Sequence, residues 1–156
     1  MLNLSIVIPL YNEEKRLKKT LPALSDFLRN SKKDKIEIIF VSDGSNDKTN
    51  DIIEKYRLTK SIKYKVKFIK YKNNIGKGHA VKKGILIAKH KWILLCDTDL
   101  SVHPNQFKIW FNNKKIKSSK EAYYGSREHK DSIVKASIYR ILLGFFFKKL
   151  IKYMFK

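Results

Sequence analysis

The sequence predicts an α/β protein whose mainly parallel sheet is flanked by helices. The first observation is that four apolar, β-branched runs, at 4–10, 36–42, 66–71 and 92–97, alternate with stretches of helical spacing. Strands that alternate with helices of ten or more residues imply βαβ units with right-handed crossovers. The second observation is that the runs are almost uniformly apolar, which predicts strands covered on both faces.

The predicted helices fill the gaps between these strands. Over 14–29 leucines recur every three or four residues and mark one helix face, at Leu17, Leu21, Leu24 and Leu28. Asn46 or Asp47 can cap a helix over about 48–58, and the same helical period returns over 79–89. A fifth strand is expected at 122–126, AYYGS, and a further helix after Pro104.

The last stretch, 133–156, differs from the rest in that it holds six basic residues and no acid. Its apolar residues follow helical spacing, while Lys148, Lys152 and Lys156 lie four apart on another face. We therefore divide the chain into a domain at 1–132 and a basic amphipathic helical tail at 133–156. Such a helix can lie in the interface of an anionic membrane, and the alternative is a helix packed on the sheet with solvated lysines.

The net charge of +21 admits two interpretations. Lysines spread along the chain can simply solvate the surface, or they can serve an anionic partner such as a nucleic acid, a phosphate-rich substrate or a membrane. Cys96 is the single cysteine, which excludes an internal disulfide and favours a buried, unreactive thiol. With no signal peptide and no apolar stretch of about 18 residues, a cytoplasmic compartment is expected.

Polar, turn-rich segments follow each predicted strand. In parallel sheets ligands bind at the carboxyl ends of the strands, so these segments are expected to meet at one edge. They comprise Pro9 to Glu13, Ser42 to Ser45, Asn73 to Gly78, and Asp97 to Asp99. This convergence predicts a ligand site without reference to any known protein.

Two aspartates stand at the end of the fourth strand, in the stretch ILLCDTDLS. In extended geometry Asp97 and Asp99 point to the same side, and two carboxylates held close repel unless a cation lies between them. Mg²⁺ or Mn²⁺, held by one or two carboxylates plus substrate phosphates, would remove the repulsion. The alternative is that Asp99 caps the helix after Pro104, or that both carboxylates face water.

The other strand ends offer weaker signals. The amides of Asn74-Ile75-Gly76-Lys77-Gly78 can approach a phosphate and Lys77 can add a charge, although the segment is no Walker motif and a plain turn is the alternative. A base could stack on Tyr11, and Arg127 could clamp a phosphate. The four histidines lack the spacing of metal ligands.

In order along the chain, IVIPLYNEE, VSDGSNDKT, NNIGKGHAV, CDTDLS and YGSR resemble the sequence blocks of family 2 inverting glycosyltransferases with the GT-A fold. The resemblance covers residues 3 to 145 and is greatest to dolichyl- or polyprenyl-phosphate glucosyltransferases, then to the mannosyltransferases. It implies the α/β GT-A nucleotide-sugar-binding fold, a UDP-glucose or GDP-mannose donor, a polyprenyl or dolichyl phosphate acceptor, and peripheral association with the cytoplasmic face of a membrane.

The resemblance also implies roles for individual residues. Those implied to hold the nucleotide sugar are Pro9, Tyr11, Asn12, Glu13, Asp43, Gly44, Lys77 and Asp97, with Asp43 at the base and Lys77 near the diphosphate. Asp97 and Asp99 are implied to be the metal-binding and catalytic pair, with Mg²⁺ or Mn²⁺ as the ion. Arg127 is implied to be catalytic, on the donor or the acceptor phosphate. A lipid phosphate is already ionised near neutral pH, so no catalytic base is assigned.

Two departures from the family pattern create an alternative. Many relatives carry Asp-Asp-Gly where this chain has Ser42-Asp43-Gly44, and relatives continue beyond the position of Lys156. A truncated gene product that binds a nucleotide sugar without transferring it is therefore the second hypothesis. A nucleic-acid-binding protein is the third, motivated by the charge. It is opposed by the carboxylates at the expected site, so no nucleic acid is expected as partner.

Overall fold

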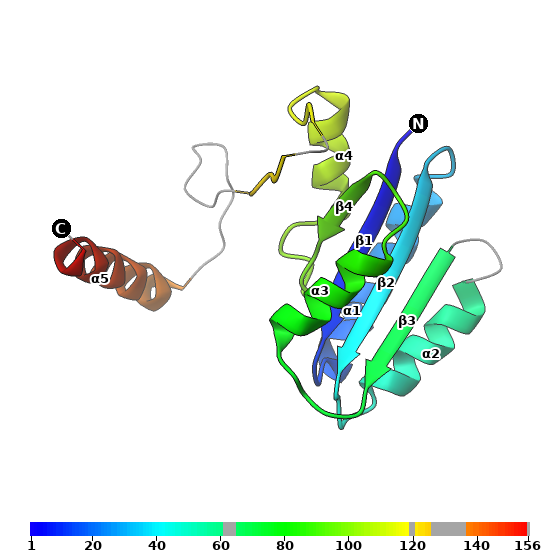
Figure 1. Ribbon diagram of the computed structural model, residues 1–156, viewed down its shortest axis with the longest axis horizontal. Coiled ribbons are helices and arrows are strands. Elements are labelled where there is room, and N and C mark those ends of the chain that lie inside the picture. Colours follow the sequence, from blue (N-terminus) through cyan, green and yellow to red (C-terminus); the bar gives the residue numbers. More distant parts are fainter. Residues whose placement is uncertain (61–64, 119–120, 126–136, 156) are drawn as a thin grey trace. The chain divides into compact units, whose positions relative to one another are not determined.

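The computed structural model describes residues 1–60, 65–118, 121–125 and 137–155. By the contacts within it, the chain forms two compact units, Met1–Ala122 and Tyr123–Lys156. The first unit holds a sheet with helices on both sides, and the described part of the second unit holds one helix (Figure 1). The boundary expected between 132 and 133 lies outside the described residues, and so does Arg127.

The sheet of the first unit has four parallel strands in the order β3-β2-β1-β4. They run over Asn3–Leu10 (β1), Lys35–Asp43 (β2), Lys65–Tyr71 (β3) and Trp92–Leu95 (β4). Each begins and ends within one or two residues of its predicted range. The chain passes from β1 outward to β3 and then returns to β4 on the other side of β1, so the strand order reverses next to β1.

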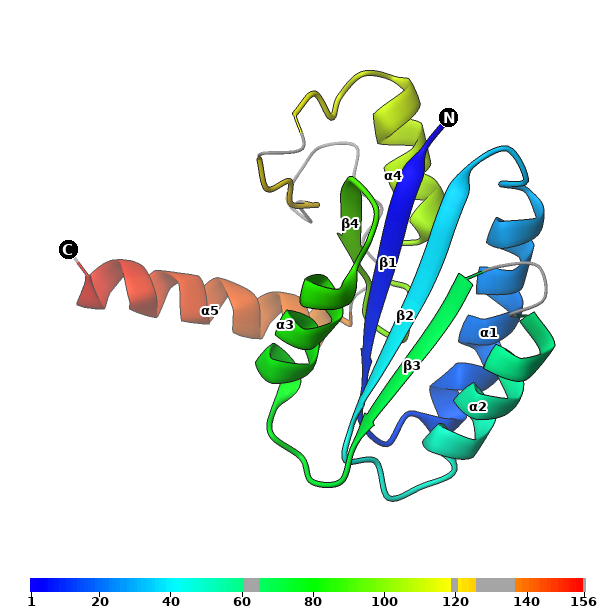
Figure 2. The same cartoon turned by 45° about the vertical axis from the view of Figure 1, so that its right-hand side comes forward.

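Helices cover both faces of this sheet, as Figure 2 shows. They are Glu14–Arg29 (α1), Thr49–Lys60 (α2), Lys77–Ile87 (α3) and Pro104–Asn112 (α4). Helix α3 packs on β1 and β2 from one side, whereas α1 contacts α2 and α4 on the other. The observed α/β arrangement is the predicted one, and α1 has the predicted limits of 14–29.

Alternation along the central strands divides the core into two layers. Leu4, Ile6, Ile8 and Leu10 of β1 belong to the larger cluster, which also holds the leucines of α1. Val7, between them in sequence, packs instead with Ile39 and Ala80 on the α3 side. Seven of the eight residues of β1 and eight of the nine of β2 are buried, so these two strands are covered on both faces as predicted.

Helix α3 lies very close to the sheet because a glycine faces it. A Cβ atom placed on Gly84 would come within 2.3 Å of Cγ1 of Val7. Ala80, one turn earlier, is fully buried in the same contact. Small residues at both positions therefore set the short distance between α3 and β1.

The expectation of cover on both faces is wrong for β4. Trp92 and Leu94 pack against the core, and the Trp92 ring contacts Phe107 and Phe111 of α4 at centroid distances of 5.9 and 6.0 Å. Ile93 and Leu95 point the other way and are 39% and 46% exposed. Within the described residues β4 is the edge of the sheet, and α3 lies over β1 and β2 instead, which leaves these two side chains uncovered there.

A buried carboxylate joins the strands near their amino ends. Glu37 of β2 is fully buried, and its Oε1 accepts hydrogen bonds from the Ser5 hydroxyl at 2.7 Å and the Lys89 amide at 2.6 Å. The Lys67 ammonium lies 2.7 Å from the other oxygen. Burial opposes ionisation of Glu37, but the hydrogen bonds from Lys67, Lys89 and Ser5 outweigh it and hold its pKa below the ordinary value.

Cys96 follows β4 and is buried. Burial, with the nearby charge of Asp97, raises the pKa of its thiol to about 12. The thiol is therefore protonated at neutral pH, in agreement with the expectation of an unreactive cysteine.

The second unit contains α5, Ile138–Met154. A helix is therefore present in the predicted tail, but no strand forms over 122–125, so the fifth strand is wrong for those residues. Lys148, Lys149 and Lys152 lie in the second half of α5, whereas Arg140 is the single charged residue in the first half. Among the helices in the described ranges, none has both the length and the apolar character needed to cross a membrane.

Candidate functional site

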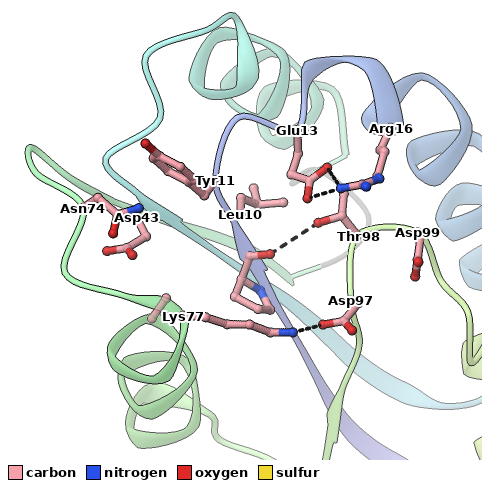
Figure 3. Close-up of a pocket in the computed structure, with 12 residues that line it drawn as sticks. Leu10, Tyr11, Glu13, Arg16, Asp43, Asn74, Lys77, Asp97, Thr98 and Asp99 are labelled. Carbon is pink, nitrogen blue, oxygen red and sulfur yellow. Dashed lines mark hydrogen bonds and ion pairs between the residues drawn. The ribbon is translucent and has the colours of Figure 1, made fainter. Parts of the chain in front are cut away.

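A cavity of about 310 Å³ lies at the carboxyl ends of the strands. Its lining comes from the ends of β1 and β2, from the loops after β3 and β4, and from the first turns of α1 and α3, as Figure 3 shows. The lining residues are Pro9, Leu10, Tyr11, Glu13, Arg16, Asp43, Asn74, Lys77, Ala80, Asp97, Thr98 and Asp99. The predicted convergence of Asp43, Lys77 and Asp99 in one cleft is therefore confirmed.

The wall after β1 is held in place by the loop after β2. The amides of Asn12 and Glu13 donate to the hydroxyls of Ser45 and Thr49, at 3.1 and 2.8 Å. Asp47 accepts from the Thr49 amide at 3.0 Å and from the Glu14 amide at 3.1 Å, so one carboxylate caps the starts of both α1 and α2. These contacts fix the backbone that carries Tyr11 and Glu13 into the cavity.

The side chain of Asn12 has a structural partner instead of facing the cavity. Its Oδ1 accepts from the Asn46 amide at 2.8 Å, and its backbone is in the left-handed region with φ of 52°. Asparagine tolerates this conformation better than most residues. Asn12 does not line the cavity, and its implied contact with the nucleotide sugar remains a prediction.

Asp43 positions the loop after β3. It is 2% exposed, and its two carboxylate oxygens accept from the amides of Ile75 and Gly76 at 2.9 and 2.7 Å. The carboxylate therefore draws the NNIGKG loop against the end of β2 and places Lys77 at the start of α3. These hydrogen bonds do not test the implied contact between Asp43 and the base of the nucleotide, which remains a prediction.

Gly44 allows this close approach of the two loops. Its φ is 72°, and a Cβ atom there would lie 2.5 Å from the carbonyl carbon of Asn73 and from the amide nitrogen of Asn74. Gly44 itself does not line the cavity. Glycine is needed at this position because its backbone has a positive φ and because a Cβ atom would collide with the neighbouring loop.

Gly44→Ala is therefore expected to lower the free energy of unfolding by about 2–4 kcal/mol, from positive-φ strain and overpacking against backbone. Urea denaturation followed by circular dichroism measures the change. Gly78→Ala is the matched control, because nothing lies within 4 Å of a Cβ atom at Gly78. A Gly44 variant as stable as the Gly78 variant would contradict the close approach.

The aspartate pair is held in a turn and not in the extended geometry that the sequence suggested. The Leu100 amide donates to the Asp97 carbonyl at 3.0 Å, and Leu100 has a φ of 49°. Asp99 Oδ1 accepts from the Ser101 amide at 2.9 Å, while His103 caps α4, so Asp99 is not that helix's cap. The Thr98 hydroxyl, buried below, donates to the Pro9 carbonyl at 3.3 Å.

Two cations in the cavity wall pair with carboxylates. The Lys77 ammonium lies 2.6 Å from Oδ1 of Asp97. Nη1 of Arg16 donates to both oxygens of Glu13, at 2.8 and 2.9 Å. The hydrogen bonds and charge of Glu13, together with the charge of Asp99, raise the pKa of the Arg16 guanidinium, so this side chain stays charged.

The local charge of the cavity is opposite to that of the chain. Four carboxylates, from Glu13, Asp43, Asp97 and Asp99, line it with two cations, so these six side chains carry a formal charge of −2. Although the chain has a net charge of +21, this cavity therefore offers negative charge to a small cation.

The aspartate pair fits an ion that arrives with its own phosphate ligands. Carboxylate oxygens are the donors that Mg²⁺ and Mn²⁺ prefer, and such ions commonly use one or two carboxylates plus phosphates and water. Within the described residues no group of three or more His, Cys, Asp or Glu side chains gathers to form a complete protein site. Asp97 and Asp99 supply the type of oxygen donor that an ion with phosphate ligands would need, and metal binding by this pair remains a prediction.

Most of the predicted site residues meet in the cavity, and some of its residues were missed. Pro9, Tyr11, Glu13, Asp43, Lys77, Asp97 and Asp99 all line it. Arg16 was overlooked, although its spacing of three residues from Glu13 in the first turn of α1 signals an ion pair. Asn74 and Thr98 belong to the segments that also contain Lys77 and the aspartate pair, but they were not themselves predicted as site residues.

Comparison with protein families and curated proteins gives consistent matches. The model of a family described as Glycosyl transferase family 2 matches residues 5–150. A dolichyl-phosphate beta-glucosyltransferase from Dictyostelium discoideum is 35% identical over 153 residues, which cover 92% of this chain and 46% of that protein. The chain spans about half the length of the curated relatives that it matches over nearly its whole length.

Solved structures also resemble the present one. The structure of S. aureus TarS 1-349 in complex with UDP-GlcNAc has a TM-score of 0.58 and 28% identity, covering 71% of this chain and 30% of that one. The mannosyltransferase PcManGT from Pyrobaculum calidifontis, in complex with GDP-Man and Mn²⁺, has a TM-score of 0.55 and 20% identity over 64% of this chain and 28% of that one. The second likeness shows a shared fold alone.

Proposed function

This chain belongs to glycosyl transferase family 2, and we propose that the protein moves a hexose from a nucleotide sugar to a polyprenyl phosphate. The observation that carries the proposal is the single cavity that gathers Tyr11, Asp43, Lys77, Asp97 and Asp99 at the carboxyl ends of the strands. The dolichyl-phosphate glucosyltransferase that matches 92% of the chain supports a lipid phosphate as acceptor and glucose as the sugar.

The proposed donor is UDP-glucose, with GDP-mannose as the alternative. Tyr11 is 47% exposed at one side of the cavity and offers a ring face to a base. Lys77 and the aspartate pair lie at the opposite side, where a diphosphate would reach them (Figure 3). The proposed assignment therefore runs from the base at Tyr11 and Asp43 to the diphosphate at Lys77, Asp97 and Asp99.

In the proposed mechanism Asp97 and Asp99 would hold Mg²⁺ or Mn²⁺ through carboxylate oxygens. The ion, when bound, neutralises charge that develops on the leaving diphosphate. An oxygen of the acceptor phosphate attacks the anomeric carbon from the side opposite the diphosphate, and the bond to the diphosphate breaks, so the configuration inverts. Because a phosphate monoester has a second pKa of about 6, the nucleophile is already ionised and needs no protein base.

The acceptor side of the proposal involves a membrane. Helix α5 exposes large apolar side chains, among them Phe145, Phe146 and Phe147, and carries three lysines in its second half. Such a helix can insert apolar side chains between lipids while its lysines contact anionic headgroups. We propose peripheral association with the cytoplasmic face of a membrane, with Arg127 on a donor or acceptor phosphate.

Labelled UDP-glucose or GDP-mannose, incubated with the protein, Mn²⁺ and a short polyprenyl phosphate, tests the proposal. We expect metal-dependent formation of a labelled, lipid-extractable product. Binding of the donor without transfer would instead indicate a nucleotide-sugar-binding module that lacks the activity. If neither donor binds at any Mn²⁺ concentration, the proposed function is wrong.

A further inference from the structure

The ion pair between Lys77 and Asp97 suggests how the site acquires its metal. Lys77 is the first residue of α3, and Asp97 lies 20 residues later, beyond β4. The 2.6 Å contact therefore joins a protein cation to one of the two carboxylates suited to a metal. A carboxylate oxygen occupied by an ammonium is less available to a second cation.

We propose that Lys77 competes with the divalent cation for Asp97 and moves to the diphosphate when a metal–nucleotide complex binds. Lys77 then disfavours binding of the bare ion and favours binding of the ion together with the nucleotide. This inference rests on the proposed function, because it concerns the order in which the ion and the donor enter the same site.

The exposure of Lys77 is compatible with such a transfer. Its side chain is 65% exposed and that of Asp97 is 57% exposed, so most of the ion pair is in contact with solvent. An ammonium on a four-carbon stem can turn from a carboxylate to a neighbouring phosphate oxygen. An exposed pair of this kind is also weak enough for a dication to displace it.

Arg16 is similarly exposed, at 63%, but it is paired differently. Its Nη1 bonds both oxygens of Glu13, whose side chain is only 15% exposed. This bidentate arrangement pairs the guanidinium with Glu13, the N-cap residue of α1, three residues earlier. The two cations of the cavity thus differ, since Lys77 pairs with a predicted metal ligand and Arg16 pairs with a different carboxylate.

The electrostatic balance gives the expected direction. Removal of the Lys77 charge changes the formal charge of the cavity's ionisable side chains from −2 to −3. It also removes a positive charge beside the proposed position of the dication. For charges several ångströms apart in a hydrated site, this corresponds to a change in ion affinity of about three- to tenfold.

The test measures Mn²⁺ binding by electron paramagnetic resonance of the free ion, without any turnover. Four proteins are compared with the wild type: Lys77→Met, Asp97→Asn, the double variant, and Lys82→Met. Lys82 is an exposed lysine of the same helix that does not line the cavity, so its substitution makes the same change in net charge. A second titration measures binding of labelled UDP or GDP at saturating Mn²⁺.

We expect Lys77→Met to bind Mn²⁺ alone about three- to tenfold more tightly than the wild type, and Lys82→Met to change it less than twofold. In the Asp97→Asn background the Lys77 substitution should tighten Mn²⁺ binding less, because the competition for Asp97 is gone and only the repulsion between the lysine and the ion is removed. In the presence of saturating Mn²⁺, Lys77→Met should bind the nucleotide about three- to tenfold more weakly, because the diphosphate loses its lysine contact.

Unchanged or weaker Mn²⁺ binding by Lys77→Met would overturn the inference, and so would equal tightening in Lys82→Met or in the Asp97→Asn background. Unchanged nucleotide binding by Lys77→Met would also overturn it, because the lysine would then not transfer. A wild-type protein that binds neither nucleotide at any Mn²⁺ concentration would instead reject the proposed function. Circular dichroism of each variant confirms that it is folded.

Discussion

Asp99→Asn is expected to lower metal-dependent transfer by about 10²–10³-fold. The substitution keeps the shape of the side chain and its hydrogen bond from the Ser101 amide, but removes the charge that would hold the ion. If the ion binds more weakly, it neutralises less of the negative charge that develops on the leaving diphosphate in the transition state. The rate of sugar transfer and the Mn²⁺ dependence of nucleotide binding are both measured.

Asp26→Asn provides the matched control for Asp99. Asp26 belongs to α1, its side chain is 64% exposed, and its partner is Arg29 in the same helix. The same chemical change far from the cavity should leave transfer and nucleotide binding unaltered. If the Asp99 variant retained its activity and its Mn²⁺ dependence, the metal role of this carboxylate would be excluded.

Glu37→Ala is expected to reduce the free energy of unfolding by about 3 kcal/mol. The substitution removes the carboxylate that receives the Ser5 hydroxyl and the Lys89 amide, and it leaves the Lys67 ammonium without this counter-charge. Groups on β1, on β3 and in the segment before β4 lose a common partner. Urea denaturation measures the difference.

The control for this substitution is Glu54→Ala. Glu54 pairs with Arg57 one turn later on α2, and both side chains are partly exposed. Surface pairs of this type contribute at most about 1 kcal/mol. If Glu37→Ala cost no more than Glu54→Ala, the buried carboxylate would not be the link between these strands.

The pH dependence of the Glu37 contribution has a defined sign. Because the folded protein holds the pKa of Glu37 below its ordinary value of 4.5, the unfolded chain binds more protons as the pH falls. The stabilisation is complete above that value and is lost as the pH falls through the lowered pKa. The difference in unfolding free energy between the wild type and Glu37→Gln should therefore shrink below about pH 4.5.

The sheet could be predicted because its signals are local. Each strand is a short apolar run between turn residues, and the leucines of α1 mark its full length at the correct limits. The exposure of Ile93 and Leu95 could not be predicted, because an apolar run does not say whether the strand is central or at an edge. The same holds for 122–125, where β-prone residues form no strand.

The location of the site could be predicted more fully than its contacts. The rule that ligands bind at the carboxyl ends of parallel strands brought Asp43, Lys77 and Asp99 together correctly. The hydrogen bonds of Asp43 to the amides of Ile75 and Gly76 join residues more than 30 apart in the sequence, so no local pattern reveals them. The turn at 97–100 also escaped prediction, because Asp-Thr-Asp-Leu follows a strand without Gly or Pro to mark it.

Gly84 affects the position of the Lys77 ammonium, which lies seven residues earlier at the start of α3. Because no side chain separates this position from Val7, the axis of α3 is fixed at a short height above the strands. That height, together with the loop held by Asp43, affects how far the ammonium of Lys77 extends over the cavity. A larger residue at position 84 would push α3 away from β1. It would thereby shift Lys77 at the start of the helix, although position 84 does not itself line the cavity.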